Sequence, residues 1–184
     1  MEAELTDLQD QIDQGTEHLL ATISTLTDDD VRAPSLLPDW TRGHVVTHVA
    51  RVGEALRNLL VWARTGVPIP PYVSQDARDA DIAAGAGRSA AELLADVIQS
   101  AQALRAAAVE VPDEGWERTV GVPGSLEFPA SQVLVRRLVE VELHHVDLGA
   151  GYRANDWPTR FVDLDLPEPM RSQRAERSSW PGGA

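Results

Sequence analysis

The stretch 130-ASQVLVRRLVEVELHHVDLG-149 is the part of the chain that decides the fold. On a helical wheel at roughly 100° per residue, its apolar residues fall into two nearly opposite stripes, one made of Leu134, Leu138, Val141 and Leu148 and the other of Val135, Val139, Leu143 and Val146. A helix that is apolar on two sides is expected to lie inside a bundle, with partners on both sides. Pro129 precedes the stretch and Gly149 ends it, so we predict a helix from about Ala130 to Leu148.

A polar sector lies between these two stripes and consists of Arg137, Glu140, His144 and Asp147. Burying such side chains without partners would cost on the order of several kcal/mol each. They therefore need one another, a neighbouring helix or a metal ion. Glu140 and His144 are four residues apart, so their side chains lie on the same helix face, as two metal ligands from one helix often do.

Three more segments have helical periodicity: from about Leu5 to Leu26, from about Thr41 to Thr65 and from about Ser89 to Val109. Asp39 or Thr41 can cap the second segment, and Ser89 with Glu92 forms a capping box at the start of the third. Four helices of this length predict an all-α four-helix bundle.

The remaining segments are predicted to be irregular. A long loop is expected to begin at Pro68, and residues 116–128 contain glycine and proline that favour a short hairpin or an ordered loop before the last helix. Residues 162–184 are rich in Pro, Arg, Ser and Gly and are predicted to be a flexible tail. We thus expect a bundle over residues 1–161 and a tail over residues 162–184.

His48 is the best candidate for a third ligand from another helix. It lies at the edge of an apolar stripe formed by Val45, Val49, Val52, Leu56, Leu59 and Ala63, whereas His44 lies further out on the flank. Two histidines and one carboxylate leave an open coordination position, which is the pattern of catalytic rather than structural zinc. Asp147 is placed to orient one of these ligands without itself binding the metal, and Arg137 or Arg51 could bind an acidic substrate.

Simpler interpretations of the same residues stay open at this point. A histidine at the edge of an apolar stripe is more often a packed boundary residue than a ligand. Arg137 and Glu140, three residues apart, can form an ordinary ion pair. His145 faces an apolar stripe and is expected to pack in the core, and His18 is expected on a solvated face.

Composition narrows the choice of function. The 184 residues include no cysteine, so disulfides, thiolate metal sites and an internal thiol nucleophile are excluded. The net charge of -13 argues against nucleic acid or an anionic membrane as a partner. We find neither a run of about 18 apolar residues nor the basic start of a secretory signal. We therefore expect a cytoplasmic protein with small-molecule ligands, and a homodimer is plausible.

Two stretches resemble a known family. The first is 37-LPDWTRGHVVTHVAR-51 and the second is 137-RLVEVELHHVDLG-149, followed by Gly151-Tyr152 and Asp156-Trp157-Pro158. In this order they resemble the mycothiol-dependent maleylpyruvate isomerase-like proteins, which belong to the DinB-like superfamily of metal-binding four-helix bundles. The likeness covers residues 5 to about 161 and corresponds to the N-terminal metal-binding domain of the family.

The resemblance implies a DinB-like bundle in which His48, Glu140 and His144 bind zinc or another divalent metal. It also implies mycothiol as the thiol cosubstrate, which agrees with the absence of cysteine. The metal-bound thiol would add to an electrophilic substrate, in a cis-trans isomerase or a mycothiol S-transferase. Full-length isomerases carry a further C-terminal domain with a catalytic arginine, and residues after Trp157 do not look like that domain. The alternatives are a thiol-independent metal hydrolase and a non-catalytic metal-binding module.

Overall fold

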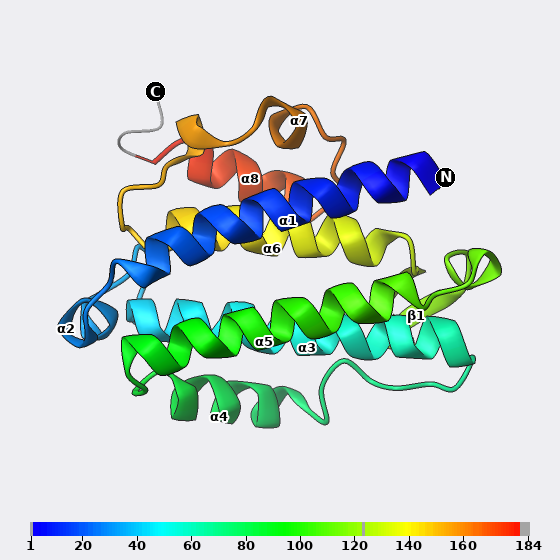
Figure 1. The fold of residues 1–184 in the computed structure, drawn as a ribbon, viewed down its shortest axis with the longest axis horizontal. Helices are drawn as coiled ribbons and strands as arrows, with labels where there is room; N and C mark the ends of the chain where they lie inside the picture. Colours follow the sequence, from blue (N-terminus) through cyan, green and yellow to red (C-terminus); the bar gives the residue numbers. More distant parts are fainter. Residues whose placement is uncertain (1, 123, 181–184) are drawn as a thin grey trace.

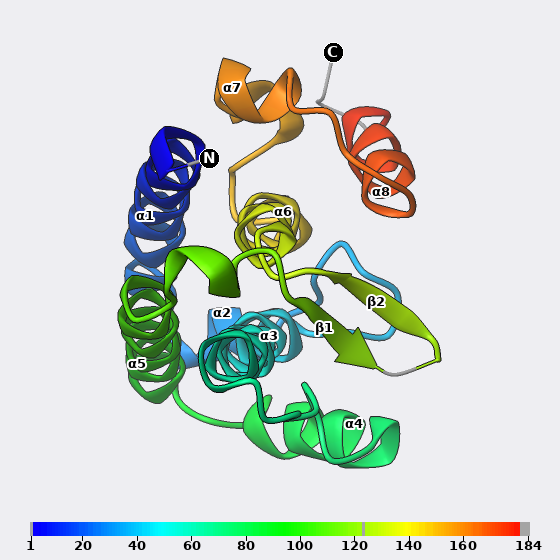
Figure 2. The ribbon, with the colours of Figure 1, turned by 90° about the vertical axis from the view of Figure 1, so that its right-hand side faces the viewer.

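The computed structural model describes residues 2–122 and 124–180, and four long helices dominate it. They are α1 (Glu2–Ser24), α3 (Arg42–Thr65), α5 (Ala90–Val109) and α6 (Gln132–Asp147). The four run along the long axis of the molecule in Figure 1, and Figure 2 shows them end-on as a square. α1 contacts α5 and α6, and α3 contacts the same two helices, so the all-α four-helix bundle is confirmed.

The ends of the long helices are set by the capping residues that the sequence predicts. The Thr41 hydroxyl accepts a hydrogen bond from the His44 N–H, while the Thr41 N–H donates to Nδ1 of His44. Ser89 and Glu92 form the same kind of reciprocal box at the start of α5. Gly66 ends α3 in the left-handed conformation, with a φ of 73°, which glycine adopts without steric cost.

α6 contacts two apolar clusters, but these divide along the length of the helix and not by stripe: Leu134 and Leu138 of the first stripe lie in one cluster, and Val141 and Leu148 of the same stripe lie in the other. All stripe residues are buried except Val135, which is half-buried. One cluster contains Leu134, Leu138 and Leu143 with the aromatic side chains of Trp116, Phe128, Trp157 and Phe161. The other contains Val141 and Leu148 with apolar residues of α1, α3 and α5. Among the described residues, no helix is both long enough and apolar enough to cross a membrane.

The structure also contains short helices and strands, of which only some were predicted from the sequence. Of the two predicted alternatives, a hairpin or an ordered loop, the structure contains the hairpin strands: β1 (Thr119–Val122) is antiparallel to β2 (Leu126–Pro129), with Val122 opposite Leu126. The prediction of a long loop after Pro68 is wrong for its second half, which forms the helix α4 (Gln75–Gly85) and packs on α3. Ser74 caps α4, since its hydroxyl accepts a hydrogen bond from the N–H of Ala77. The other short helices are α2 (Asp28–Arg32), η1 (Asp113–Gly115) and η2 (Ala154–Asp156).

The segment for which a flexible tail is expected contains two further helices, α7 (Thr159–Val162) and α8 (Met170–Ser178). α8 packs against α6, and Leu166 and Met170 are buried in the aromatic cluster. The segment is rich in polar residues, so the sequence did not predict that Leu166 and Met170 would be buried. It also did not predict the buried Arg177, which is described below. The prediction is wrong for the described part of this segment, and its last residues, 181–184, lie outside the described residues.

Gly43 is required where α3 passes the end of α4. A Cβ atom at this position would lie 2.3 Å from the carbonyl oxygen of Ala86, which is backbone and cannot move aside cheaply. We expect Gly43→Ala to lower the free energy of unfolding by about 1–3 kcal/mol, although alanine favours helices. Urea denaturation measures this change. Gly87→Ala is the control, since nothing lies within 4 Å of its added Cβ; equal effects in both variants would contradict the explanation.

Candidate metal centre

His48, Glu140 and His144 converge between α3 and α6, although 92 residues separate the first from the second. Nε2 of His48 lies 3.2 Å from Oε2 of Glu140, and Nε2 of His144 lies 3.0 Å from the same oxygen. The rings of the two histidines are perpendicular, with centroids 4.5 Å apart. One potential ligand atom from each residue lies within 4.8 Å of the others, so the three could hold one cation.

The surroundings of the three side chains favour positive charge between them. Burial tends to raise the pKa of Glu140, but hydrogen bonds from His144 and His48 hold that pKa well below its ordinary value. Burial tends to lower the pKa of His144, yet hydrogen bonds to Asp147 and Glu140 raise it to about 9. Burial lowers the pKa of His48. The carboxylate of Glu140 is therefore ionised, and its negative charge could offset a cation that replaced the protons on the two imidazole nitrogens facing it.

Asp147 fixes the orientation of the His144 ring. Its Oδ2 lies 2.7 Å from Nδ1 of His144, which leaves Nε2 directed toward Glu140. The Asp147 side chain is fully buried and is itself held by Arg177 of α8, whose Nε and Nη2 donate to Oδ1 and Oδ2 at 3.0 Å each. Sequence reasoning proposed Asp147 for this position but missed Arg177, because its segment was predicted to be a tail.

Arg78 and Trp40 surround His48 on its other side. Nη2 of Arg78, from α4, donates to Nδ1 of His48 at 3.1 Å, and the edge of the Trp40 ring system faces the imidazole at 5.5 Å. Arg78 also lies 5.8 Å from the centre of the Tyr72 ring and lines a cavity of about 300 Å³, together with Tyr72 and Arg51 but with none of the three candidate ligands. Arg78 was not predicted to be a site residue, because its helix was expected to be a loop. Ser74, a residue type that often caps helices, could have indicated the start of this helix.

In the described part of the chain, Arg137 and Arg51 make no hydrogen bond to the three candidate ligands. Arg137 is fully buried, and its Nη1 donates to the carbonyl oxygen of Val49 at 2.9 Å. Arg51 is paired with Asp96 and, at 3.2 Å, with Glu54. On α6 it is Arg136, four residues before Glu140, that lies on the same helix face as this carboxylate.

The other histidines lie apart from this cluster. His145 is buried as predicted, stacked on Tyr152 with centroids 3.7 Å apart, and its Nε2 lies 2.7 Å from the hydroxyl oxygen of Thr22. Burial lowers the pKa of His145 to about 4. His44 belongs to the Thr41 cap, and His18 is exposed as predicted.

An all-α bundle with two histidines and a glutamate facing each other across two helices defines the class of the protein, the DinB-like bundles. A family model described as the mycothiol maleylpyruvate isomerase N-terminal domain matches residues 12–149, and the chain belongs to this family. No curated protein matches the chain.

Two solved structures support the family assignment. They are a mycothiol-dependent maleylpyruvate isomerase and the same enzyme with one histidine-to-alanine substitution. Each is 34% identical to this chain with a TM-score of 0.81, and each alignment covers 86% of this chain. The chain spans 66% of the length of those solved proteins.

Proposed function

We propose that the chain is a zinc-dependent enzyme that uses mycothiol to isomerise an electrophilic acid between its cis and trans forms. The observation that carries the proposal is the convergence of His48, Glu140 and His144, from two distant helices, in a chain of this family. The similar solved proteins are named as mycothiol-dependent isomerases of maleylpyruvate. A substrate of the same class, an unsaturated keto acid, is the first choice for this chain.

The three side chains suit a catalytic zinc ion. Two imidazole nitrogens and one carboxylate oxygen are the donor set of open zinc sites, and Asp147 provides the carboxylate partner that zinc-bound histidines usually have. A divalent ion held there would supply the Lewis acidity that keeps a thiol deprotonated near neutral pH. Because the chain has no cysteine, that thiol must come from a cosubstrate.

The residues around the centre have separable roles in this chemistry. Asp147 keeps His144 in one ring orientation, and Glu140 supplies the negative charge that offsets the cation. Addition of the thiol sulfur to one carbon of the double bond makes that bond single and free to rotate, and elimination of the same thiol returns the trans isomer. Arg78 lies beside His48, and although its Nη1 donates to the exposed Asp79, its guanidinium can hold a substrate carboxylate during the rotation.

The test of the proposal is turnover by metal-loaded protein with and without mycothiol. We expect isomerisation of maleylpyruvate, followed by absorbance, to depend on the thiol. Accumulation of a stable thiol conjugate would instead indicate an S-transferase. Ester or amide hydrolysis that is indifferent to thiol would indicate a metal hydrolase and would overturn the proposal. A chain that binds metal without turnover of any of these substrates would be a non-catalytic module.

Arg78→Gln is expected to lower kcat/KM for an acidic substrate by about 10- to 100-fold, because a charge-assisted hydrogen bond to the carboxylate is lost. Its metal content should stay near that of the unchanged protein. Arg57→Gln is the matched control, since Arg57 is an exposed arginine of α3. Equal loss of activity in the two variants would show that Arg78 has no specific role.

A further inference from the structure

Arg137 is a buried cation for which the described residues provide too few partners. Its side chain is fully buried, and Nη1 donates to the carbonyl oxygen of Val49. Nε and Nη2 are buried as well, and neither has a hydrogen-bond partner in the described part of the chain. Because a guanidinium keeps its charge at physiological pH and buried donors without acceptors are rare in native proteins, this arrangement requires an explanation.

The two donors without partners are the pair that fits a carboxylate. Nε–H and Nη2–H project in parallel from one edge of the guanidinium plane, at a spacing that matches two carboxylate oxygens. Thr16 of α1 is also buried, with 7% exposure, and its hydroxyl has no partner among the described residues. Thr16 and Arg137 both line one cavity, and their donor atoms without partners lie buried in its wall.

This cavity has a volume of about 380 Å³ and lies between α1 and α5, with Arg137 of α6 at its base. Its walls are mainly apolar and include Ile12, Leu20, Ile98, Ala101 and Leu104. The volume and the mixture of apolar walls with a few polar groups are typical of sites for small molecules.

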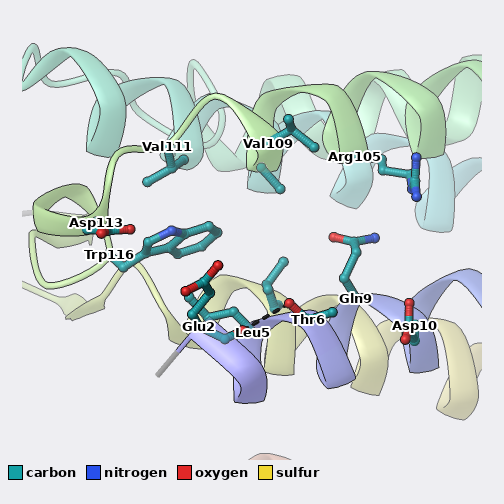
Figure 3. A pocket seen from close by; sticks show the side chains of 12 residues that line it. Glu2, Leu5, Thr6, Gln9, Asp10, Arg105, Val109, Val111, Asp113 and Trp116 are labelled. Atoms are coloured by element: carbon teal, nitrogen blue, oxygen red, sulfur yellow. Dashed lines mark hydrogen bonds between the residues drawn. The ribbon is translucent and has the colours of Figure 1, made fainter.

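A second hollow of about 510 Å³ continues along the same two helices toward the start of α1. Gln9 and Arg105 line both hollows, so the two adjoin where these side chains contact Asp13, and we refer to the pair of hollows as the groove. Figure 3 shows Gln9 on the α1 side and Arg105 on the α5 side, with the Trp116 ring across the gap further along. Glu2, Asp10 and Asp113 line the second hollow, so the apolar body of a ligand is expected to lie within the first.

Acidic side chains of the groove restrict what can bind. Asp13 is already neutralised, since Gln9 and Arg105 donate to its two carboxylate oxygens at 2.9 Å each. Glu17 also lines the cavity and repels additional negative charge. A ligand with one negative charge and an apolar body therefore fits better than phosphate or a dicarboxylate.

We propose that the groove between α1 and α5 is a second small-molecule site, separate from the candidate metal centre, which binds a monocarboxylate with an aliphatic body. The carboxylate would accept hydrogen bonds from Nε and Nη2 of Arg137 and from the hydroxyl of Thr16. The apolar body would lie against Ile12 and Leu104. This proposal does not depend on the proposed function.

Octanoate is the probe, and its binding is measured by calorimetry and by chemical-shift changes in NMR spectra of the full chain. We expect a Kd on the order of 0.1–1 mM, with at least tenfold weaker binding of 1-octanol, which has no charge. Arg137→Met should weaken octanoate binding at least tenfold. Thr16→Val should weaken it about fivefold, an effect that reflects one lost hydrogen bond of about 1 kcal/mol.

Two control variants separate this site from the metal centre. Arg136→Met removes the neighbouring arginine on another face of α6 and should leave octanoate binding unchanged. His48→Ala should also leave it unchanged, which excludes binding of the carboxylate to a metal. Arg137→Lys keeps the positive charge without the paired donors and should weaken binding at least fivefold. If Arg137→Met does not fold, Arg137→Lys and Thr16→Val decide the question.

The proposal is overturned if the unchanged protein shows no octanoate binding at about 10 mM, or if it binds octanol equally well. It is also overturned if Arg137→Lys and Thr16→Val bind as tightly as the unchanged protein.

Discussion

Replacing His48 with alanine is expected to reduce the bound zinc from about one ion per chain to almost none. The remaining ligands, Glu140 and His144, lie on one helix and lose the ligand that α3 contributes from the opposite side. Two ligands leave a zinc site incomplete, so isomerase activity should fall by at least about 100-fold. Elemental analysis of protein purified without added metal measures the zinc content directly, whatever the substrate proves to be.

His44→Ala and His145→Ala provide matched controls for this experiment. Loss of the His44 ring removes its part of the α3 cap, with an expected cost of about 0.5–2 kcal/mol in stability but no loss of metal. His145→Ala removes a buried ring that stacks on Tyr152, so it should lower the melting temperature and leave the zinc content unchanged. If either control lost as much metal as His48→Ala, the three-residue assignment would be wrong.

The long helices and the three candidate ligands could be predicted from the sequence because each has a local signal. Capping residues such as Thr41 and Ser89 begin helices, and the polar sector on a doubly apolar helix identifies Glu140 and His144 as buried groups in need of partners. His48 followed from its place at the edge of an apolar stripe. These inferences use the spacing of residues within one helix, whereas the choice of the three as metal ligands over packed residues also used the resemblance to the family.

What could not be predicted depends on contacts between distant segments. The place of Arg137 in the polar sector with Glu140 made it, with Arg51, a predicted substrate-binding arginine, and its sequence neighbour Arg136 was not considered. Packing places Arg137 between α3 and the groove, whereas Arg136 stacks on Phe128, with 3.8 Å between its guanidinium carbon and the ring centre. Arg78 and Arg177 were missed for the same reason, since their helices are short and polar and are stabilised mainly by tertiary contacts.

Because Asp147 pairs with Arg177 and also contacts His144, replacing it is expected to lower both the stability of the protein and its affinity for zinc. Asp147→Asn removes the buried charge partner of the Arg177 guanidinium and leaves it only the exposed Glu176, so the free energy of unfolding should fall by about 3–5 kcal/mol. The same change replaces the carboxylate that orients His144, so zinc affinity should fall by about 10- to 100-fold. Urea denaturation measures the stability of the metal-free protein, and competition with a chelator measures its affinity for zinc.

The double variant Asp147→Asn with Arg177→Met separates these two effects. Removing the guanidinium as well abolishes the unpaired buried charge, so most of the lost stability should return. Zinc affinity should stay low, because His144 still lacks its carboxylate partner. Arg174→Met is the control on α8, since Arg174 donates to the carbonyl oxygens of Phe161 and Leu164 and not to Asp147. Recovery of zinc affinity together with stability would mean that Asp147 acts on the metal centre only through the fold, and that its contact with His144 has no separate role.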